Sequence, residues 1–166
     1  ADRYQELEAF AQAERKYKQL LQYYPADKRA VIDYARMQTR LGDYGHAHAL
    51  LQEKILDEDF MDYEALLASG DNYLEWASED PQYYEEAYER YIRILQGPQG
   101  GRDEPWFHLL RYHIRRDDLD QALSIMQRFE LDKSRKVDPV IYTELGGYLV
   151  TKGHLDHVKS VLTRSM

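Results

Sequence analysis

The segment Gly42-Asp43-Tyr44-Gly45-His46-Ala47 has counterparts along the whole sequence. In each counterpart an aromatic residue or a leucine precedes a small residue by three positions, as Tyr44 precedes Ala47 here. The counterparts are Tyr83-Tyr84-Glu85-Glu86-Ala87, Asp117-Asp118-Leu119-Asp120-Gln121-Ala122 and Gly153-His154-Leu155-Asp156-His157-Val158, with a further copy near the start in which Phe10 precedes Ala13. Such recurrence indicates a protein built from repeated units.

The spacing of the copies gives the size of the repeat. Their small residues are separated by 34, 40, 35 and 36 residues. A large residue follows each small one four positions later, so that both lie on one face of an amphipathic helix. The small residues are Ala13, Ala47, Ala87, Ala122 and Val158, and the large ones are Tyr17, Leu51, Tyr91, Met126 and Leu162.

A partner segment lies upstream of each later copy and has a small or apolar residue at its middle, such as Ala35 or Gly70. Glycine inside a helix costs about 1 kcal/mol relative to alanine. We therefore expect Gly70, Gly146 and Gly147 where two helices approach closely. Helix-breaking residues predict the turns at Pro25, Gly42, Pro81, Gly97-Pro98-Gln99-Gly100-Gly101, Pro139 and Gly153.

The pattern resembles the tetratricopeptide-repeat family, and the resemblance covers nearly the whole chain. It implies an all-α fold, with one domain over 1–166 that forms a right-handed superhelix of about nine helices. The expected units are a leading second helix at 1–27 and complete helix pairs at 28–60, 61–98, 102–134 and 138–166. The longest spacing predicts that the first helix of the second pair is extended by about one turn before Pro81 stops it.

Charge and composition disfavour several classes of function. The formal net charge of -8 disfavours binding to nucleic-acid phosphates, and no apolar run approaches the roughly 20 residues of a membrane helix. The absence of cysteine excludes disulfides and thiolate metal sites and suits either a cytoplasmic or a periplasmic location. Because the chain begins with Ala1 rather than Met, we expect it to be a segment of a longer sequence.

No pattern in the sequence favours catalysis, a metal or a cofactor. His46 and His48 are two residues apart and point to different faces of a helix. His154 and His157 share a face, but no further ligand accompanies them. The acidic segments at 57–59 and 117–120 fall at turns and helix starts, where Asp caps backbone amides. The glycines at 97–101 lack the Lys and Ser/Thr of a phosphate-binding loop.

The first helices of the pairs line the concave surface that the resemblance implies, where a partner is expected to bind. Their inward positions alternate in sign, with one row of Arg36, Asp71 and Arg111 and another of Arg40, Glu75 and Arg115. The rows are either ion pairs between repeats, which the alternation favours, or a peptide-binding strip with apolar anchors. The candidate groove residues are Arg29, Ile32, Arg36, Arg40, Glu64, Leu67, Asp71, Glu75, Glu104, Phe107, Arg111, Arg115, Val140 and Thr143, of which Ile32, Leu67, Phe107 and Val140 are the anchors.

We expect a non-enzymatic scaffold that binds protein partners in this groove, on the helix edges or at the ends of the stack. An apolar face formed by Phe10, Tyr17 and Leu20 at the open leading end also permits self-association. Residues 70–77 (GDNYLEWA) and 80–87 (DPQYYEEA) are similar to repeat proteins of spirochaete periplasmic flagellar assemblies, which implies an envelope-side scaffold around a motor, such as part of a motor collar. A structural or oligomerising spacer of a bacterial envelope or flagellar motor complex is the alternative. A metal-binding or enzymatic domain is the third hypothesis.

Overall fold

The computed structural model describes residues 2–131 and 139–154, and all regular secondary structure in these ranges is helical. Contacts divide the chain into two compact units, Ala1–Gly101 and Arg102–Met166. The prediction of an all-α class is confirmed for the described ranges, whereas a single domain over 1–166 stays a prediction. The last helix that the sequence predicted falls after Gly153, outside the described residues.

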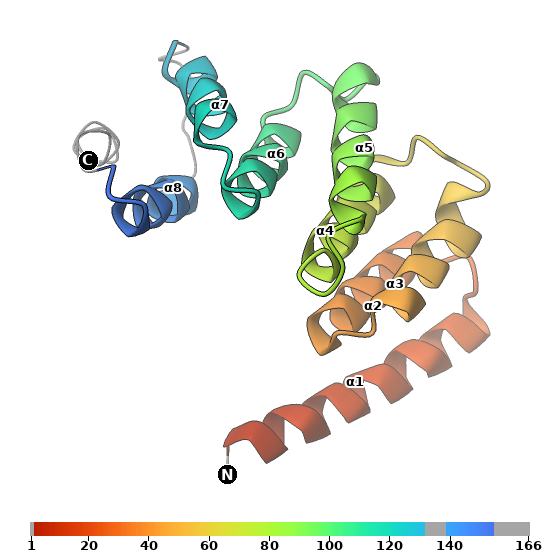
Figure 1. The fold of residues 1–166 in the computed structure, drawn as a ribbon. Coiled ribbons are helices and arrows are strands. Elements are labelled where there is room, and N and C mark those ends of the chain that lie inside the picture. Colours follow the sequence, from red (N-terminus) through yellow and green to blue (C-terminus); the bar gives the residue numbers. More distant parts are fainter. Residues whose placement is uncertain (1, 132–138, 155–166) are drawn as a thin grey trace. The chain divides into compact units, whose positions relative to one another are not determined.

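The first unit contains helix pairs that pack side by side (Figure 1). Helix α2 packs against α1 on one side and against α3 and α4 on the other, and α4 packs against α5. A short π-helix, η1, continues α3. The elements are α1 (Asp2–Tyr23), α2 (Lys28–Leu41), α3 (Tyr44–Leu51), η1 (Gln52–Leu56), α4 (Tyr63–Trp76) and α5 (Tyr83–Gln96).

The second unit repeats this arrangement with α6 (Glu104–Arg115), α7 (Leu119–Leu131) and α8 (Pro139–Thr151). Helix α6 packs against its own second helix, α7, and against the first helix of the next pair, α8. In both units, therefore, a first helix packs against the second helix of its own pair and against the first helix of the next pair, as α2 does with α3 and α4.

Three of the turns inside the pairs share an unusual backbone conformation at one repeat position. Gly42 and Gly153 have φ values of 81° and 77°, and Asp117 occupies the same place with φ 59°. A left-handed residue just after a helix satisfies its last carbonyl groups, and glycine adopts it at the least cost. Asp117 is supported there by α8 and the residue that follows it, since Tyr148 Oη donates to its Oδ1 at 2.9 Å and Lys152 Nζ to its Oδ2 at 2.7 Å.

The turn of the second pair corrects one prediction. Helix α4 has 14 residues, the same length as α2, so the first helix of this pair is not extended. The additional residues instead form the turn between Trp76 and Tyr83. Here the Asp80 carboxylate accepts hydrogen bonds from the Gln82 backbone amide at 3.1 Å and from its Nε2 at 2.8 Å. Pro81 disfavours helical geometry at Asp80, so a helix cannot continue through this turn into α5.

The repeated positions form the core. Ala47, Ala87 and Ala122 have no exposed surface, and the large residues that follow them are buried as well: Leu51, Tyr91 and Met126. A Cβ atom added to Gly70 would lie 2.5 Å from Cε1 of Tyr91, so the predicted close approach of two helices is confirmed there.

The prediction of close contact is wrong for Gly147. This residue is exposed, and a Cβ atom there would meet no described atom within 4 Å. Its neighbour Gly146 is buried. Of two adjacent glycines on a helix, only one faces the packed side.

Aspartate side chains cap several helices, which confirms the prediction for Asp118 of the acidic segment 117–120, whereas Asp59 of the segment 57–59 accepts from the Met61 amide in a turn. Asp43 accepts from the His46 amide at 3.2 Å, and Asp118 accepts from the Gln121 amide at 3.3 Å. Asp62 has two partners, since it accepts from the Ala65 amide at 3.0 Å and from Lys28 Nζ at 2.9 Å. It therefore connects the starts of α2 and α4.

Replacing Asp62 by Ala should destabilise the first unit by about 1–2 kcal/mol, because the cap and the link to α2 are lost together. Burial raises the pKa of Asp62, but the hydrogen bonds from Lys28 and Ala65 outweigh it and leave the pKa below its ordinary value of 3.8. Its stabilising effect is thus present above pH 3.8 and is lost as the pH falls further through the folded-state pKa. Urea unfolding followed by circular dichroism measures both effects, and an unchanged midpoint at pH 7 would contradict them.

Candidate functional site

The predicted groove residues of the first unit divide into exposed and buried ones. The charged side chains of Arg29, Arg36, Arg40 and Glu64 are exposed, and those of Asp71 and Glu75 are half-buried. Ile32 and Leu67 are each only 2% exposed, so they cannot serve as anchors for a partner, which corrects that part of the prediction. The reason is that α2 packs against α1, α3 and α4 at once and buries more than one of its faces.

In the second unit the predicted residues lie mostly at the surface. Glu104, Arg111, Arg115 and Thr143 are exposed, and Phe107 is half-buried. The side chain of Val140 lies outside the described residues. Phe107 is therefore the one predicted anchor for which the described structure leaves apolar surface accessible.

The charged rows contain contacts of two kinds. Arg36 forms an ion pair with Asp33 of the same helix at 3.8 Å, whereas Arg111 reaches Glu144 of the next first helix at 2.7 Å. Asp71 accepts a hydrogen bond from the Tyr91 hydroxyl of its own pair at 2.9 Å. The ion pair between Arg111 and Glu144 is a contact between repeats. The sequence did not predict Glu144 as the partner of Arg111, because Glu144 lies outside the predicted charged rows.

Several side-chain contacts join residues that are one repeat apart. Lys28 and Asp62 are separated by 34 residues, and Arg111 and Glu144 by 33. The hydroxyl of Thr39 donates to Oδ1 of Asn72, 33 residues later, at 2.7 Å. Neighbouring first helices are thus in direct side-chain contact within each unit.

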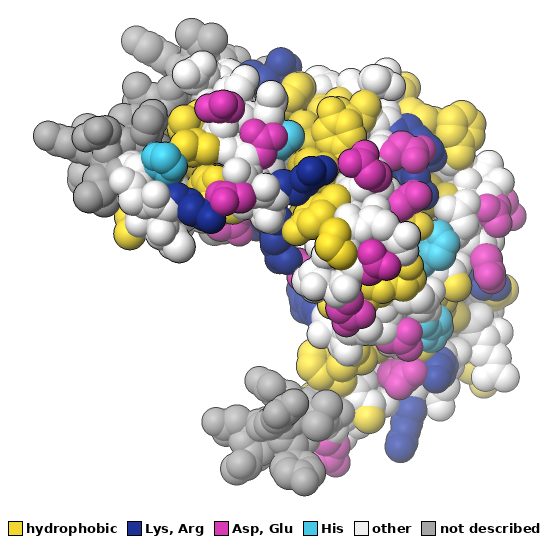
Figure 2. Space-filling view, viewed as in Figure 1, with side chains coloured by type: hydrophobic (Ala, Val, Ile, Leu, Met, Phe, Trp, Pro, Cys, Tyr) yellow, Lys and Arg dark blue, Asp and Glu magenta, His cyan; other side chains and the backbone are white. Residues whose placement is uncertain are grey.

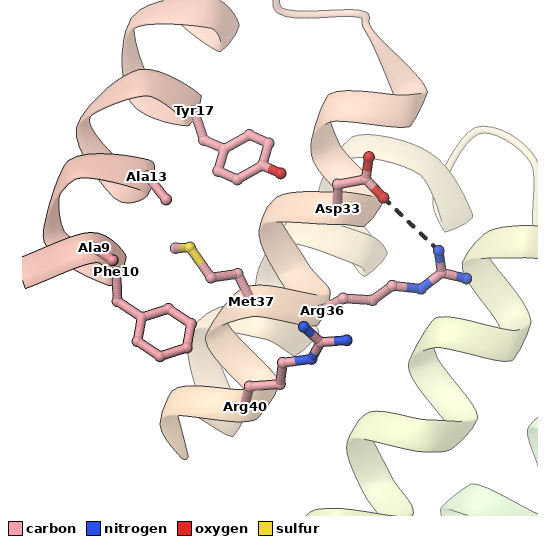
Figure 3. Close-up of a pocket in the computed structure, with 8 residues that line it drawn as sticks. All are labelled: Ala9, Phe10, Ala13, Tyr17, Asp33, Arg36, Met37 and Arg40. Atoms are coloured by element: carbon pink, nitrogen blue, oxygen red, sulfur yellow. Dashed lines mark ion pairs between the residues drawn. The ribbon is translucent and has the colours of Figure 1, made fainter. Parts of the chain in front are cut away.

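An open, mainly apolar cavity of about 570 Å³ lies between α1 and α2 in the first unit and is named here the α1–α2 cavity (Figure 3). The side chains of Phe10, Tyr17 and Met37 lie between the two helices. Its lining residues are Ala9, Phe10, Ala13 and Tyr17 from α1 and Asp33, Arg36, Met37 and Arg40 from α2. The cavity brings together two features that the sequence suggested separately, namely the apolar face with Phe10 and Tyr17 on α1 and the basic residues Arg36 and Arg40 on α2.

A buried tyrosine fixes the position of α1 against α2. The rings of Tyr17 and Tyr34 stack with centroids 5.5 Å apart, and the Tyr34 hydroxyl donates to Glu14 at 3.3 Å. Burial raises the pKa of Tyr34, so its hydroxyl stays protonated and remains a donor. These contacts hold the two walls of the α1–α2 cavity together.

The rim of the α1–α2 cavity is polar and partly unpaired. Asp33 accepts from Arg29 at 3.4 Å and pairs with Arg36, whereas Arg40 forms no ion pair or hydrogen bond with any described residue. The Tyr17 hydroxyl likewise has no hydrogen-bond partner in the described part of the chain. A ligand in the cavity could therefore gain apolar contact on the floor, an ion pair with Arg40 and a hydrogen bond with Tyr17.

His46 and His48, which the sequence placed two residues apart on one helix, each have a partner nearby. His46 lies 3.7 Å from the Asp43 carboxylate, and His48 Nδ1 lies 3.0 Å from the Tyr73 hydroxyl, so the two side chains have different surroundings. Burial lowers the pKa of His48, which keeps it neutral at pH 7. Among the described residues no group of three or more possible ligands could hold a metal ion. Of the two histidines expected to share a helix face, His154 is described and His157 lies outside the described residues.

The face of the molecule drawn in Figure 2 carries mixed charge. Basic side chains lie on this face among acidic and hydrophobic ones rather than in a field of their own. None of the described helices is long and apolar enough to cross a membrane. The sequence matches no protein-family model, and the search of curated proteins found no match.

Proposed function

We propose that this chain is a non-enzymatic scaffold that binds a protein partner, and that its helix pairs belong to a right-handed solenoid similar to tetratricopeptide-repeat proteins. The α1–α2 cavity carries the proposal. It has an apolar floor, a charged rim, and in Arg40 a cation that pairs with no described residue. Concave apolar surfaces with a few convergent polar groups are the usual form of binding sites.

Two observations support the repeat architecture. Contacts between residues 33 and 34 positions apart agree with a period near 34. The left-handed residues Gly42, Asp117 and Gly153 also occupy one position of the aligned copies. A solenoid of such pairs presents a long surface of first helices, and binding of other proteins is the common use of that surface.

Affinity capture with variants tests this function. The immobilised chain would be incubated with an extract of its source organism, beside a double variant in which Ala13→Leu fills the cavity and Arg40→Glu reverses the rim charge. Lys16→Glu is the matched control, because Lys16 is exposed on α1 and does not line the cavity. We expect defined proteins to be retained by the wild type and by Lys16→Glu, and to be reduced at least about tenfold with the double variant.

The same experiment separates the alternatives. Proteins that bind all three chains equally would contradict a role for the cavity. If the chain captures only copies of itself and forms a dimer in sedimentation experiments, it is an oligomerising spacer and the scaffold function is wrong.

A further inference from the structure

We infer that a buried histidine contact makes the packing of α3 against α4 and α5 sensitive to pH. The residues are His48 on α3, Tyr73 on α4 and Arg90 on α5, named here the His48 cluster. When His48 binds a proton, the Tyr73 hydroxyl loses its acceptor and a second cation joins Arg90, so that α3 loosens from the other two helices. This inference concerns the first unit alone and does not depend on the scaffold function.

Tyr73 lies at the centre of the His48 cluster. Its hydroxyl and Nδ1 of His48 are 3.0 Å apart, and the centroids of the two rings are 5.5 Å apart. The guanidinium carbon of Arg90 lies over the Tyr73 ring, 5.4 Å from its centroid. Tyr73 is only 6% exposed and Arg90 only 8%, so one buried ring joins side chains from three helices.

The hydrogen bond between Tyr73 and His48 has a fixed direction. Burial raises the pKa of Tyr73, so its hydroxyl stays protonated and donates. Nδ1 of His48 therefore accepts, and the proton of the neutral ring is on Nε2. In the protonated ring both nitrogens are donors, so Nδ1 can no longer accept. The Tyr73 hydroxyl could then only accept from His48, and its own proton would lose its partner in a buried place.

Arg90 makes a second cation costly at this place. Its ion pairs are long, at 3.5 Å to Glu89 and 3.7 Å to Glu86, and its Nε has no hydrogen-bond partner in the described part of the chain. Burial is the largest cause that lowers the pKa of His48, and the charge of Arg90 is the next. The His48 cluster thus already holds one buried cation that is incompletely compensated.

Three carboxylates act on His48 in the opposite direction, each by less than burial or Arg90. They are Glu86 of α5, Glu53 of η1 and Asp57, which follows η1. From α4 the group that faces His48 is Tyr73, and from α2 Tyr34 faces the neighbouring His46, with 5.4 Å between ring centroids. The net result is a pKa of His48 below its ordinary value of 6.5.

The lowered pKa sets the pH range of the effect. The unfolded chain takes up a proton at His48 as the pH falls through 6.5, whereas the folded unit takes it up only at lower pH. The stability that the neutral His48 cluster contributes is therefore complete above pH 6.5. It is lost as the pH falls from 6.5 to the folded-state pKa.

Other contacts keep α2 and α4 together in this pH range. Thr39 of α2 donates to Asn72 of α4 at 2.7 Å, and neither side chain titrates. Asn72 also donates to the Tyr44 carbonyl at the start of α3, at 3.0 Å. The part that loosens is therefore the later half of α3, from His48 onward, together with η1.

Trp76 can report the state of the His48 cluster. Its ring stacks with Tyr73 at 6.2 Å between centroids and with Tyr83 at 3.9 Å. A movement of Tyr73 therefore changes the surroundings of the Trp76 indole and hence its fluorescence. The chain contains two tryptophans, so Trp106→Phe in the second unit leaves Trp76 as the single emitter.

The test is a pH titration of Trp76 fluorescence in the whole chain with Trp106→Phe, from about pH 8 to about pH 5, above the ordinary pKa values of carboxylates. We expect one reversible transition with its midpoint below pH 6.5. His48→Gln should abolish it, because glutamine offers Tyr73 an acceptor and does not titrate. His46→Gln is the matched control on the same helix and should leave the midpoint unchanged.

Two further measurements make the test specific. Glu86→Gln removes an opposing carboxylate near the surface and should lower the midpoint by a few tenths of a pH unit. Hydrogen exchange, corrected for the intrinsic effect of pH, should show the amides of residues 48–56 exchanging at least about threefold faster below the midpoint than above it. The same amides in His48→Gln should show no such difference.

Several outcomes would overturn the inference. A transition that persists in His48→Gln belongs to another group, and a midpoint at or above pH 6.5 contradicts the burial of His48 beside a cation. Unchanged exchange of residues 48–56 would show that the unit accepts the proton without loosening. If His48→Gln does not fold, the Glu86→Gln comparison decides, because a midpoint that this change does not lower would exclude His48 as the titrating group.

Discussion

Replacing Gly70 by Ala should destabilise the first unit by about 1–2 kcal/mol, although alanine is the better helix former by about 1 kcal/mol. The new Cβ atom would lie 2.5, 2.9 and 3.0 Å from three atoms of the Tyr91 ring. Tyr91 has no exposed surface and its hydroxyl is bonded to Asp71, so the ring cannot move aside without losing other contacts. Urea unfolding followed by circular dichroism gives the difference in unfolding free energy.

Two further variants make this prediction specific. Tyr91→Leu combined with Gly70→Ala reproduces the pair found one repeat earlier, Ala35 with Leu51, and should be more stable than the sum of the two single changes predicts. Gly147→Ala is the matched control, since this helical glycine is exposed and has room for a Cβ atom among the described residues. It should stabilise the chain by about 0.5–1 kcal/mol. A similar gain at Gly70 would show that α4 and α5 are not in close contact.

Replacing Asn72 by Ala should cost about 2–4 kcal/mol. This side chain is fully buried and connects three helices, because Nδ2 donates to the Tyr44 carbonyl at 3.0 Å and Oδ1 accepts from Thr39 at 2.7 Å. Alanine removes both hydrogen bonds and leaves a small cavity between α2, α3 and α4. The loss should appear as a lower urea midpoint at pH 7.

Asn72→Asp distinguishes the hydrogen bonds from the loss of volume. The carboxylate fills the same space, but it cannot donate to the Tyr44 carbonyl and it buries a charge. Burial raises the folded-state pKa of such a group, so its cost should be largest at pH 7 and should decrease as the pH falls through that pKa. Gln12→Ala on exposed α1 is the control and should change stability by less than about 0.5 kcal/mol. An Asn72→Asp cost that does not depend on pH would contradict burial at this position.

Most helices and turns could be predicted from the sequence, because the spacing of apolar residues and the positions of helix-ending glycines agree with how the helices pack. Ala87 and Tyr91 lie on one face at helical spacing, and both are buried against the preceding helix. Gly42 and Gly153 follow the helices that they end. The turn before Tyr83 was predicted less well, because the sequence shows that extra residues are present but not whether helix or turn accommodates them.

The candidate site was predicted less completely, because it depends on which faces of a helix meet other helices. Ile32 and Leu67 occupy groove positions by periodicity, yet α2 and α4 are each in contact on several sides and bury them. The α1–α2 cavity could not be predicted from one helix alone, since Met37 and Phe10 converge only when α1 and α2 pack together. Its elements were nevertheless visible in the sequence as an apolar face on α1 and basic residues on α2.

The left-handed backbone at Asp117 has a consequence for the order of events during synthesis. A non-glycine residue in this conformation costs about 1–2 kcal/mol, and the side chains that hold it there, Tyr148 and Lys152, lie 31 and 35 residues later. On the ribosome the turn between α6 and α7 is made before these residues have left the exit tunnel. The contacts from Tyr148 and Lys152 are therefore added to this turn only after α8 has been made, so that a later part of the chain completes an earlier one.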